Sequence, residues 1–151
     1  MELIPYEQFA RLRLAQFYPV ASELDPLDNW EFMGGIWVGE ADAFTGFLRP
    51  LDRPDELGSI ELDLCELPER IATTVLGAIH LPLRRGFSID QVVRHLGPPE
   101  GTKTFVADRK SYDFTVGLHF RYYVSCTIQD SDGLIHVTVI RKDLLPGTID
   151  A

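Results

Sequence analysis

The clearest pattern of polar and apolar positions lies shortly before the two prolines at 98 and 99. Ser88, followed three residues later by Gln91, forms a capping box, the polar signature of a helix start. Gly97 supplies a residue suited to a left-handed helix end, and the prolines prevent continuation. Between these signals four apolar residues recur at helical spacing: Ile89, Val92, Val93 and Leu96. We therefore predict a helix over residues 89–96.

After this helix the spacing at which apolar residues recur changes from about 3.6 residues to 2 residues. Polar and apolar residues alternate over 111–116, 118–128 and 134–142, which is typical of strands with one buried face. A shorter strand is expected over 103–107. The segment Asp130–Gly133 has the composition of a hairpin turn. The C-terminal half is thus predicted to be a helix followed by an antiparallel β-meander.

The pairing of the last two strands can be predicted from burial. If Asp130 and Gly133 flank the turn, Ile128 faces Ile135, and every apolar residue meets an apolar one. The other face then carries polar side chains and a few large ones. Its expected pairs are Thr127 with His136, Ser125 with Thr138, and Tyr123 with Ile140. We expect this polar face to be the interaction surface.

The first half of the chain gives weaker signals. Pro5 suits the first turn of a short helix that extends to about residue 17. The glycine- and aromatic-rich segment 30–47 predicts one or two strands with a bulge or tight turn. Residues 59–65 alternate as a strand, and residues 68–79 carry a helical apolar stripe. The prediction is one α+β domain over residues 1–151, with two helices on one face of the meander.

The segment Gly86–Val92, followed by Leu96-Gly97-Pro98-Pro99, resembles the signature of small SmpA-like domains. That family includes an outer-membrane assembly lipoprotein and the repeat of β-lactamase inhibitory protein. The resemblance covers about half the chain, with residues 86–142 as the SmpA-like part. It implies two helices packed on an antiparallel sheet whose open face binds other proteins. The chain is also similar to cytosolic immunity proteins of bacterial toxin systems, which are small and acidic.

The acidic net charge of the chain indicates which classes of molecule it can bind. The formal net charge is −9, and residues 1–86 carry 15 acidic and 7 basic residues, a net charge of −8. The densest acidic cluster lies between residues 52 and 69. Such a surface repels phosphate backbones and attracts basic proteins, so we expect a protein partner and no nucleic acid.

Location and redox state follow from the remaining composition. No apolar run approaches the length of a membrane span, and charged residues interrupt the first twenty positions. We therefore expect a cytoplasmic protein that does not associate with membranes. Cys65 and Cys126 do not form a C-x-x-C pair, and we expect both to be buried or half-buried free thiols.

Motifs for catalysis, cofactor binding and metal binding are not found. The four histidines are too scattered for metal-ligand spacing, with His119 and His136 expected on the polar sheet face. Cys126 and His136 should point to opposite faces, so they cannot form a nucleophilic pair. Asp113 and Arg121 are expected as a cross-strand pair. The prediction is a non-enzyme with no cofactor and no metal.

We expect a protein-binding module, most plausibly an immunity-type inhibitor that neutralises a cognate toxin. The alternatives are a small enzyme with an active site of dispersed residues, and a regulatory or scaffolding protein with another partner. The expected partner-binding residues are four steering acids and three contact residues on the sheet face. They are Asp55, Glu56, Glu61 and Asp63 for steering, and Arg121, Tyr123 and Ile140 for contact.

Overall fold

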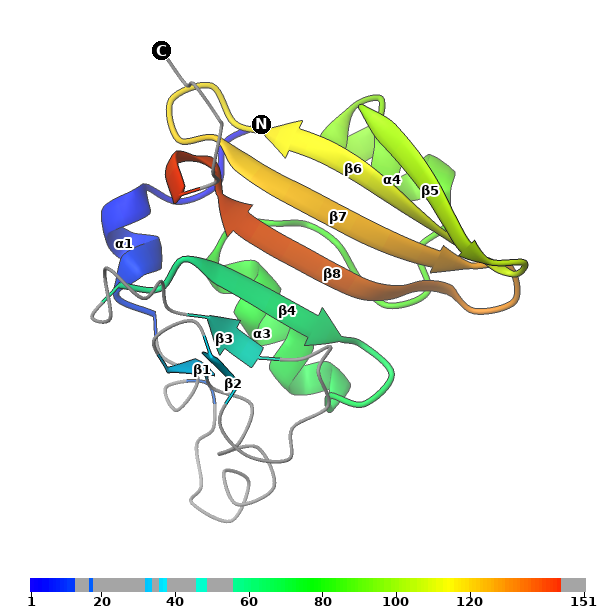
Figure 1. Cartoon of the computed structure of the whole chain (residues 1–151), viewed down its shortest axis with the longest axis horizontal. Helices are drawn as coiled ribbons and strands as arrows, with labels where there is room; N and C mark the ends of the chain where they lie inside the picture. The colour runs from blue at the N-terminus through cyan, green and yellow to red at the C-terminus, as the bar shows by residue number, and fades with distance from the viewer. Residues whose placement is uncertain (13–16, 18–31, 34–35, 38–45, 49–55, 145–151) are drawn as a thin grey trace.

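The computed structural model describes residues 1–12, 17, 32–33, 36–37, 46–48 and 56–144 (Figure 1). The helices are α1 (Tyr6–Ala10), α3 (Glu69–Ala78), α4 (Ile89–Leu96) and the 3-10 turn η3 (Lys142–Leu144). The strands of the first half are β1 (Phe32–Met33), β2 (Ile36–Trp37), β3 (Gly46–Leu48) and β4 (Ser59–Asp63). Those of the second half are β5 (Gly101–Val106), β6 (Arg109–Val116), β7 (Tyr122–Gln129) and β8 (Gly133–Arg141).

The α+β fold class is confirmed. Six strands form an antiparallel sheet in the order β3-β4-β8-β7-β6-β5, and β1 pairs with β2 in a separate hairpin. Strands β5 to β8 follow one another as the predicted meander, and β4 returns from the first half to pair with β8. Figure 1 shows α3 and α4 behind the sheet, on the same side of it. The opposite face is turned toward the viewer.

The hydrophobic core lies between the two helices and the sheet. The buried stripe of α3 is Ile71, Ala72, Val75 and Leu76, and α4 contributes Val92. Alternate residues of the strands pack against these helix residues and are fully or almost fully buried: Ile60, Leu62, Phe114, Val124, Cys126, Val137 and Val139. This is the amphipathic pattern that the sequence predicted for both helices and for β4, β7 and β8.

The capping box of α4 is confirmed. The Ser88 hydroxyl accepts a hydrogen bond from the Gln91 amide at 3.2 Å, and the Gln91 side-chain oxygen accepts one from the Ser88 amide at 2.9 Å. The helix ends at Gly97, whose φ of 84° lies in the left-handed region. A residue with a side chain rarely adopts this conformation, which explains the glycine at this position.

The predicted pairing of β7 with β8 is confirmed in its central part and wrong near the turn. Tyr123 lies opposite Ile140 and Thr127 opposite His136, as expected. Ile128, however, faces Leu134 instead of Ile135, because the register shifts between Thr127 and Ile128. The turn is one residue longer than predicted, and a bulge at Ile135 restores the alternation. The bulge explains why the two apolar neighbours Leu134 and Ile135 are both buried.

Strand β7 begins four residues later than predicted, because residues 117–121 form a turn. Gly117 has a φ of 107°, and a Cβ at this position would collide with the carbonyl oxygen of Phe120. The Glu2 carboxylate accepts hydrogen bonds from the backbone amides of Leu118 and His119. These bonds, led by the one from Leu118, lower the pKa of Glu2. His119 therefore lies in this turn, and its predicted place on the sheet face is wrong.

In the first half, α1 is confirmed over Tyr6–Ala10, but it ends there with Arg11 as its C-cap, so the predicted extension is wrong at residues 11–12. Residues 13–16 lie outside the described residues. Strands β1 and β2 lie within the segment 30–47 and β3 begins in it, so the structure has three short strands where one or two were predicted. The remainder of that segment is likewise not described. Within the ranges that the structure does describe, no helix is long and apolar enough to cross a membrane.

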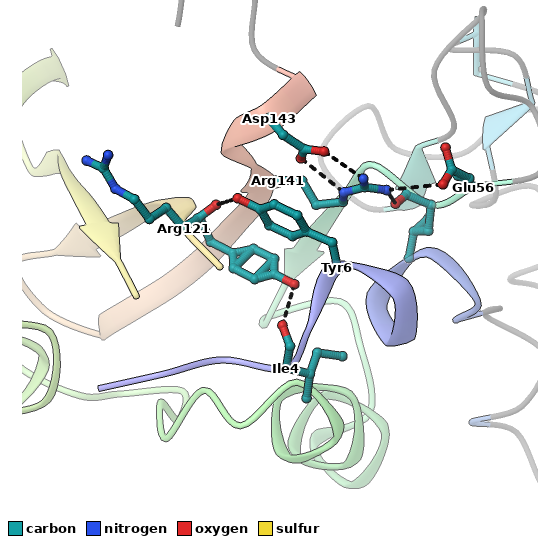
Figure 2. A network of polar contacts seen from close by, with 8 residues as sticks. Ile4, Tyr6, Glu56, Arg121, Arg141 and Asp143 are labelled. Carbon is teal, nitrogen blue, oxygen red and sulfur yellow. Dashed lines mark hydrogen bonds and ion pairs between the residues drawn. The ribbon is translucent and has the colours of Figure 1, made fainter. Parts of the chain in front are cut away.

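A buried arginine joins the N-terminal segment to the end of the sheet (Figure 2). The Arg141 guanidinium lies 5.0 Å from the centre of the Tyr6 ring and binds the Asp143 carboxylate through two hydrogen bonds of 2.7 and 3.1 Å. The hydroxyl of Tyr6 donates to the carbonyl oxygen of Arg121 at 2.5 Å. The hydroxyl of Tyr122 donates to the carbonyl oxygen of Ile4 at 2.7 Å. Residues 4–6 are thereby attached to the start of β7 and the end of β8.

Both cysteines are free, as predicted, but their burial differs. Cys126 is fully buried under the helices, and burial raises the pKa of its thiol to about 12. Cys65 lies in the turn after β4 and is exposed, so the expectation that it is buried is wrong. Cys126 lies on the helix-covered face and His136 on the other, which confirms that the two do not form a pair.

Candidate functional site: the open sheet face

The open sheet face is the side of the six-stranded sheet opposite α3 and α4. We define it by the residues that alternate with the core residues and lie opposite one another on neighbouring strands. The first row is Ser59, Ile140, Tyr123 and Thr115; the second is Glu61, Thr138, Ser125 and Asp113; the third is Asp63, His136, Thr127 and Ser111. Most of these side chains are half-buried, Ser59 and Ser111 are buried, and half of the set is serine or threonine.

Tyr123 and Ile140 lie directly opposite each other on this face, as predicted. The Tyr123 hydroxyl donates a hydrogen bond to the Asp113 carboxylate at 2.7 Å. Burial, and after it this hydrogen bond, raises the pKa of the Tyr123 hydroxyl to about 12. The ring is therefore held in a fixed orientation, and an ordered side chain loses less entropy on binding than a mobile one.

The predicted cross-strand pair of Asp113 and Arg121 is wrong. Asp113 lies opposite Ser125, because β7 begins at Tyr122 and Arg121 belongs to the preceding turn. The carbonyl oxygen of Arg121 accepts hydrogen bonds from the Tyr6 hydroxyl and the Lys142 amide. Figure 2 shows the Arg121 side chain pointing away from Tyr6 and Arg141. Arg121 is thus placed beside the row of Tyr123 and Ile140, at the end of the face.

The four predicted steering acids do not form one group. Glu61 and Asp63 lie on the open sheet face two residues apart on β4, opposite Thr138 and His136. Glu56 lies 3.9 Å from Arg141, beside α1, and Asp55 lies outside the described residues. Burial raises the pKa of Glu61. Of the four acids, Glu61 and Asp63 are therefore the two that the structure places on the same face as Tyr123.

The third row borders a groove of about 520 Å³, which crosses the sheet from β4 to β5. Its polar lining includes Asp63 and His136, and the hydroxyls of Ser111 and Thr127 form a hydrogen bond at 3.0 Å. Its apolar lining includes Ile135 and the exposed Val106. The sequence pattern did not predict this groove, because regular alternation places Ile135 on the covered face. The adjacent apolar residues Leu134 and Ile135 were the only signal that a bulge would place it otherwise.

No group of three or more histidine, cysteine or acidic residues could hold a metal ion within the described ranges. Two further hollows of about 420 Å³ each lie outside the open sheet face. One lies between the start of α4 and the β7–β8 turn, and the other lies beside Arg141. The guanidinium in the second is already bound by Asp143.

Comparison with known proteins gives no match: no family model, no curated protein and no solved structure is significantly similar to the chain.

Proposed function

We propose that the chain is a protein-binding module that acts as an immunity-type inhibitor and occupies a toxin through its open sheet face. One observation carries the proposal. Two helices bury one face of the sheet, while the other presents an ordered array of hydroxyl, aromatic and acidic side chains without a helix over it in the described part of the chain. A one-sided antiparallel sheet with such a face is suited to contact with another protein.

The composition of the face supports a protein as the partner. Tyr123 is an aromatic residue of the type that dominates binding energies, and the apolar Ile140 lies beside it. The net charge of −9 favours a basic partner, because opposite charges accelerate the encounter. The proposal also rests on the resemblance of residues 86–99 to SmpA-like domains, a family whose members bind other proteins.

The test is to express the chain together with the product of the gene that neighbours its own, and to measure direct binding and whether the toxicity of that product is neutralised. In surface plasmon resonance, Tyr123→Ala should raise the dissociation rate about 30-fold, equivalent to about 2 kcal/mol, with little change in the association rate. The matched control is Leu118→Ala, which removes an apolar side chain that is 82% exposed and lies off the face. It should leave both rates unchanged.

Two outcomes would contradict the proposal. If the neighbouring gene product is neither bound nor neutralised, the inhibitor function is wrong. If binding occurs but folded Tyr123→Ala dissociates at the wild-type rate, the open sheet face is not the binding surface. Folding of each variant is checked by its circular dichroism and unfolding midpoint.

A further inference from the structure

We propose that the groove of the open sheet face receives one arginine side chain of the partner protein, with the guanidinium directed toward Asp63. This inference rests on the proposed function and specifies the chemistry of the partner at one position. It concerns the third row and the bulge, which are separate from Tyr123 and Ile140 in the first row.

The groove has the shape for a long side chain with an apolar stem. Its volume of about 520 Å³ lies within the range of pockets that enclose small ligands. Ile135 supplies apolar surface on β8, the strand next to Asp63, and Thr127 and Thr138 line the groove beside it, whereas Val106 lies at the far side on β5. The methylene chain of an arginine packs favourably on such surface while its charged head remains polar.

The two sides of the groove carry opposite charges. Asp63 lies at the β4 side, with Glu61 two residues earlier on the same face. Arg109 lies at the opposite side on β6, where its guanidinium is 4.0 Å from the Asp108 carboxylate. A cationic head is therefore attracted toward β4 and repelled from β6. The acidic excess of residues 1–86 acts in the same direction over longer range.

The distribution of acceptors favours arginine over lysine. The hydroxyl residues Ser125, Thr127 and Thr138 line the groove together with Asp63. A guanidinium carries five N–H donors in a planar fork and can use several separated acceptors at once. A lysine ammonium concentrates its three donors at one atom, so it reaches fewer of them. The inference requires the negative charge of Asp63 and the apolar wall, and it does not require any acceptor to lack a partner within the chain.

The test uses three short peptides that differ only in their central side chain: acetyl-Gly-Arg-Gly-amide, its lysine analogue and its citrulline analogue. Citrulline keeps the length and most of the shape of arginine but carries no charge. Each is titrated into the isotopically labelled full chain and followed by amide chemical shifts. The arginine peptide should bind with a dissociation constant on the order of millimolar and shift the amides of Thr127, Ile135 and Thr138. The lysine peptide should bind more weakly, and the citrulline peptide should leave these amides unshifted.

Asp63→Asn is the decisive variant. The Asp63 carboxylate accepts backbone hydrogen bonds from Cys65 at 2.9 Å and Glu66 at 3.2 Å. An asparagine keeps an oxygen for these bonds while removing the charge, so the turn should be retained. Binding of the arginine peptide should weaken at least about tenfold, as for the loss of a charge-assisted contact. Glu66→Gln makes the same change of charge at an exposed position outside the groove and should leave binding unchanged.

The inference is overturned if arginine and citrulline peptides shift the groove equally, if none shifts it, or if both charge variants weaken binding alike. These results leave the proposed function standing, because a toxin can still bind through Tyr123 and Ile140. Conversely, if the peptide binds as expected and no toxin is neutralised, the groove is an arginine site on a protein with another partner.

Discussion

At the scale of single residues, the buried side chain of Arg141 needs the most compensating interactions. Its side chain is only 5% exposed, and a buried guanidinium is stable only if charges and acceptors surround it. Asp143 supplies a two-bond ion pair, the Tyr6 ring supplies a cation–π contact, and the Leu57 carbonyl lies at 3.5 Å. Because these partners come from three separate segments, the arginine joins parts of the chain that are distant in sequence.

The first prediction follows from that burial. Asp143→Ala should lower the free energy of unfolding by about 2–3 kcal/mol, because it leaves a buried cation short of its main partner. The matched control is Glu7→Ala, which removes the carboxylate partner of Arg11 in an ion pair whose side chains are 75% and 74% exposed. It should cost about 0.3–0.5 kcal/mol, as for exposed pairs on helices. Urea denaturation measures both, and equal losses would show that Arg141 does not depend on Asp143.

At the scale of elements, α4 illustrates how local signals define a short helix. It has only eight residues, a length at which an isolated helix is unstable in water. Its reciprocal cap satisfies backbone donors at the start, and Val92 attaches it to the core. The cap therefore stabilises an element that depends on packing for most of its stability.

The contribution of the cap can be measured directly. Ser88→Ala should lower the free energy of unfolding by about 1 kcal/mol, because the Gln91 amide loses its acceptor. Ser88→Gly should cost only a few tenths of a kcal/mol, since glycine is itself tolerated at this position. The comparison is made by thermal unfolding at one protein concentration. If alanine and glycine behave alike, the capping hydrogen bonds contribute no measurable stability.

The sequence predicted those elements whose signals are local. The caps of α4, the stripe of α3 and the alternation of β7 determined their limits to within a few residues. The turn at 117–121 was not predicted, because apolar Leu118 and Phe120 continue the strand alternation. What ends the strand there is the backbone of Gly117 and a contact with Glu2, 116 residues away in sequence. The alternation of residues within one segment cannot predict a contact with a residue so distant in sequence.

The candidate site was predicted in part for the same reason. Alternation correctly placed Tyr123, Ile140 and His136 on the face away from the core. It could not place Ile135, because a bulge reverses the alternation at one residue. Nor could it separate Glu56 from Glu61, since the position of Glu56 depends on the distant Arg141. Short-range periodicity identifies a face, while grooves and charge pairs depend on tertiary contacts.

At the scale of the whole molecule, the acidic residues and the aromatic residue of the open sheet face lie in different halves of the sequence. Most of the excess acid lies in residues 1–86, whereas the described aromatic contact residue of the face belongs to the second half. Strand β4 brings Glu61 and Asp63 onto that face beside β8. Long-range attraction and short-range contact should therefore respond to different substitutions.

Neutralising Asp55, Glu56, Glu61 and Asp63 together should slow association with the proposed partner at least several-fold and flatten its salt dependence. The dissociation rate should change little when Asp55, Glu56 and Glu61 alone are neutralised, and it should rise when Asp63, the proposed groove contact, is included. Because burial raises the pKa of Glu61, its share of the attraction should decline at a higher pH than that of an ordinary glutamate. Surface plasmon resonance at two salt concentrations measures this. An unchanged association rate would mean that these acids do not steer the partner.

The strict alternation of the strands has a consequence for how the protein can change. Each of the strands β4, β7 and β8 assigns every second residue to the core and the others to the open sheet face, apart from the bulge. The residues on the open sheet face include the small hydroxyl residues Ser125, Thr127 and Thr138, which leave space for larger side chains. Substitutions at half of the positions in each strand can therefore change the chemistry of the open sheet face while the core residues, and with them the fold, stay the same.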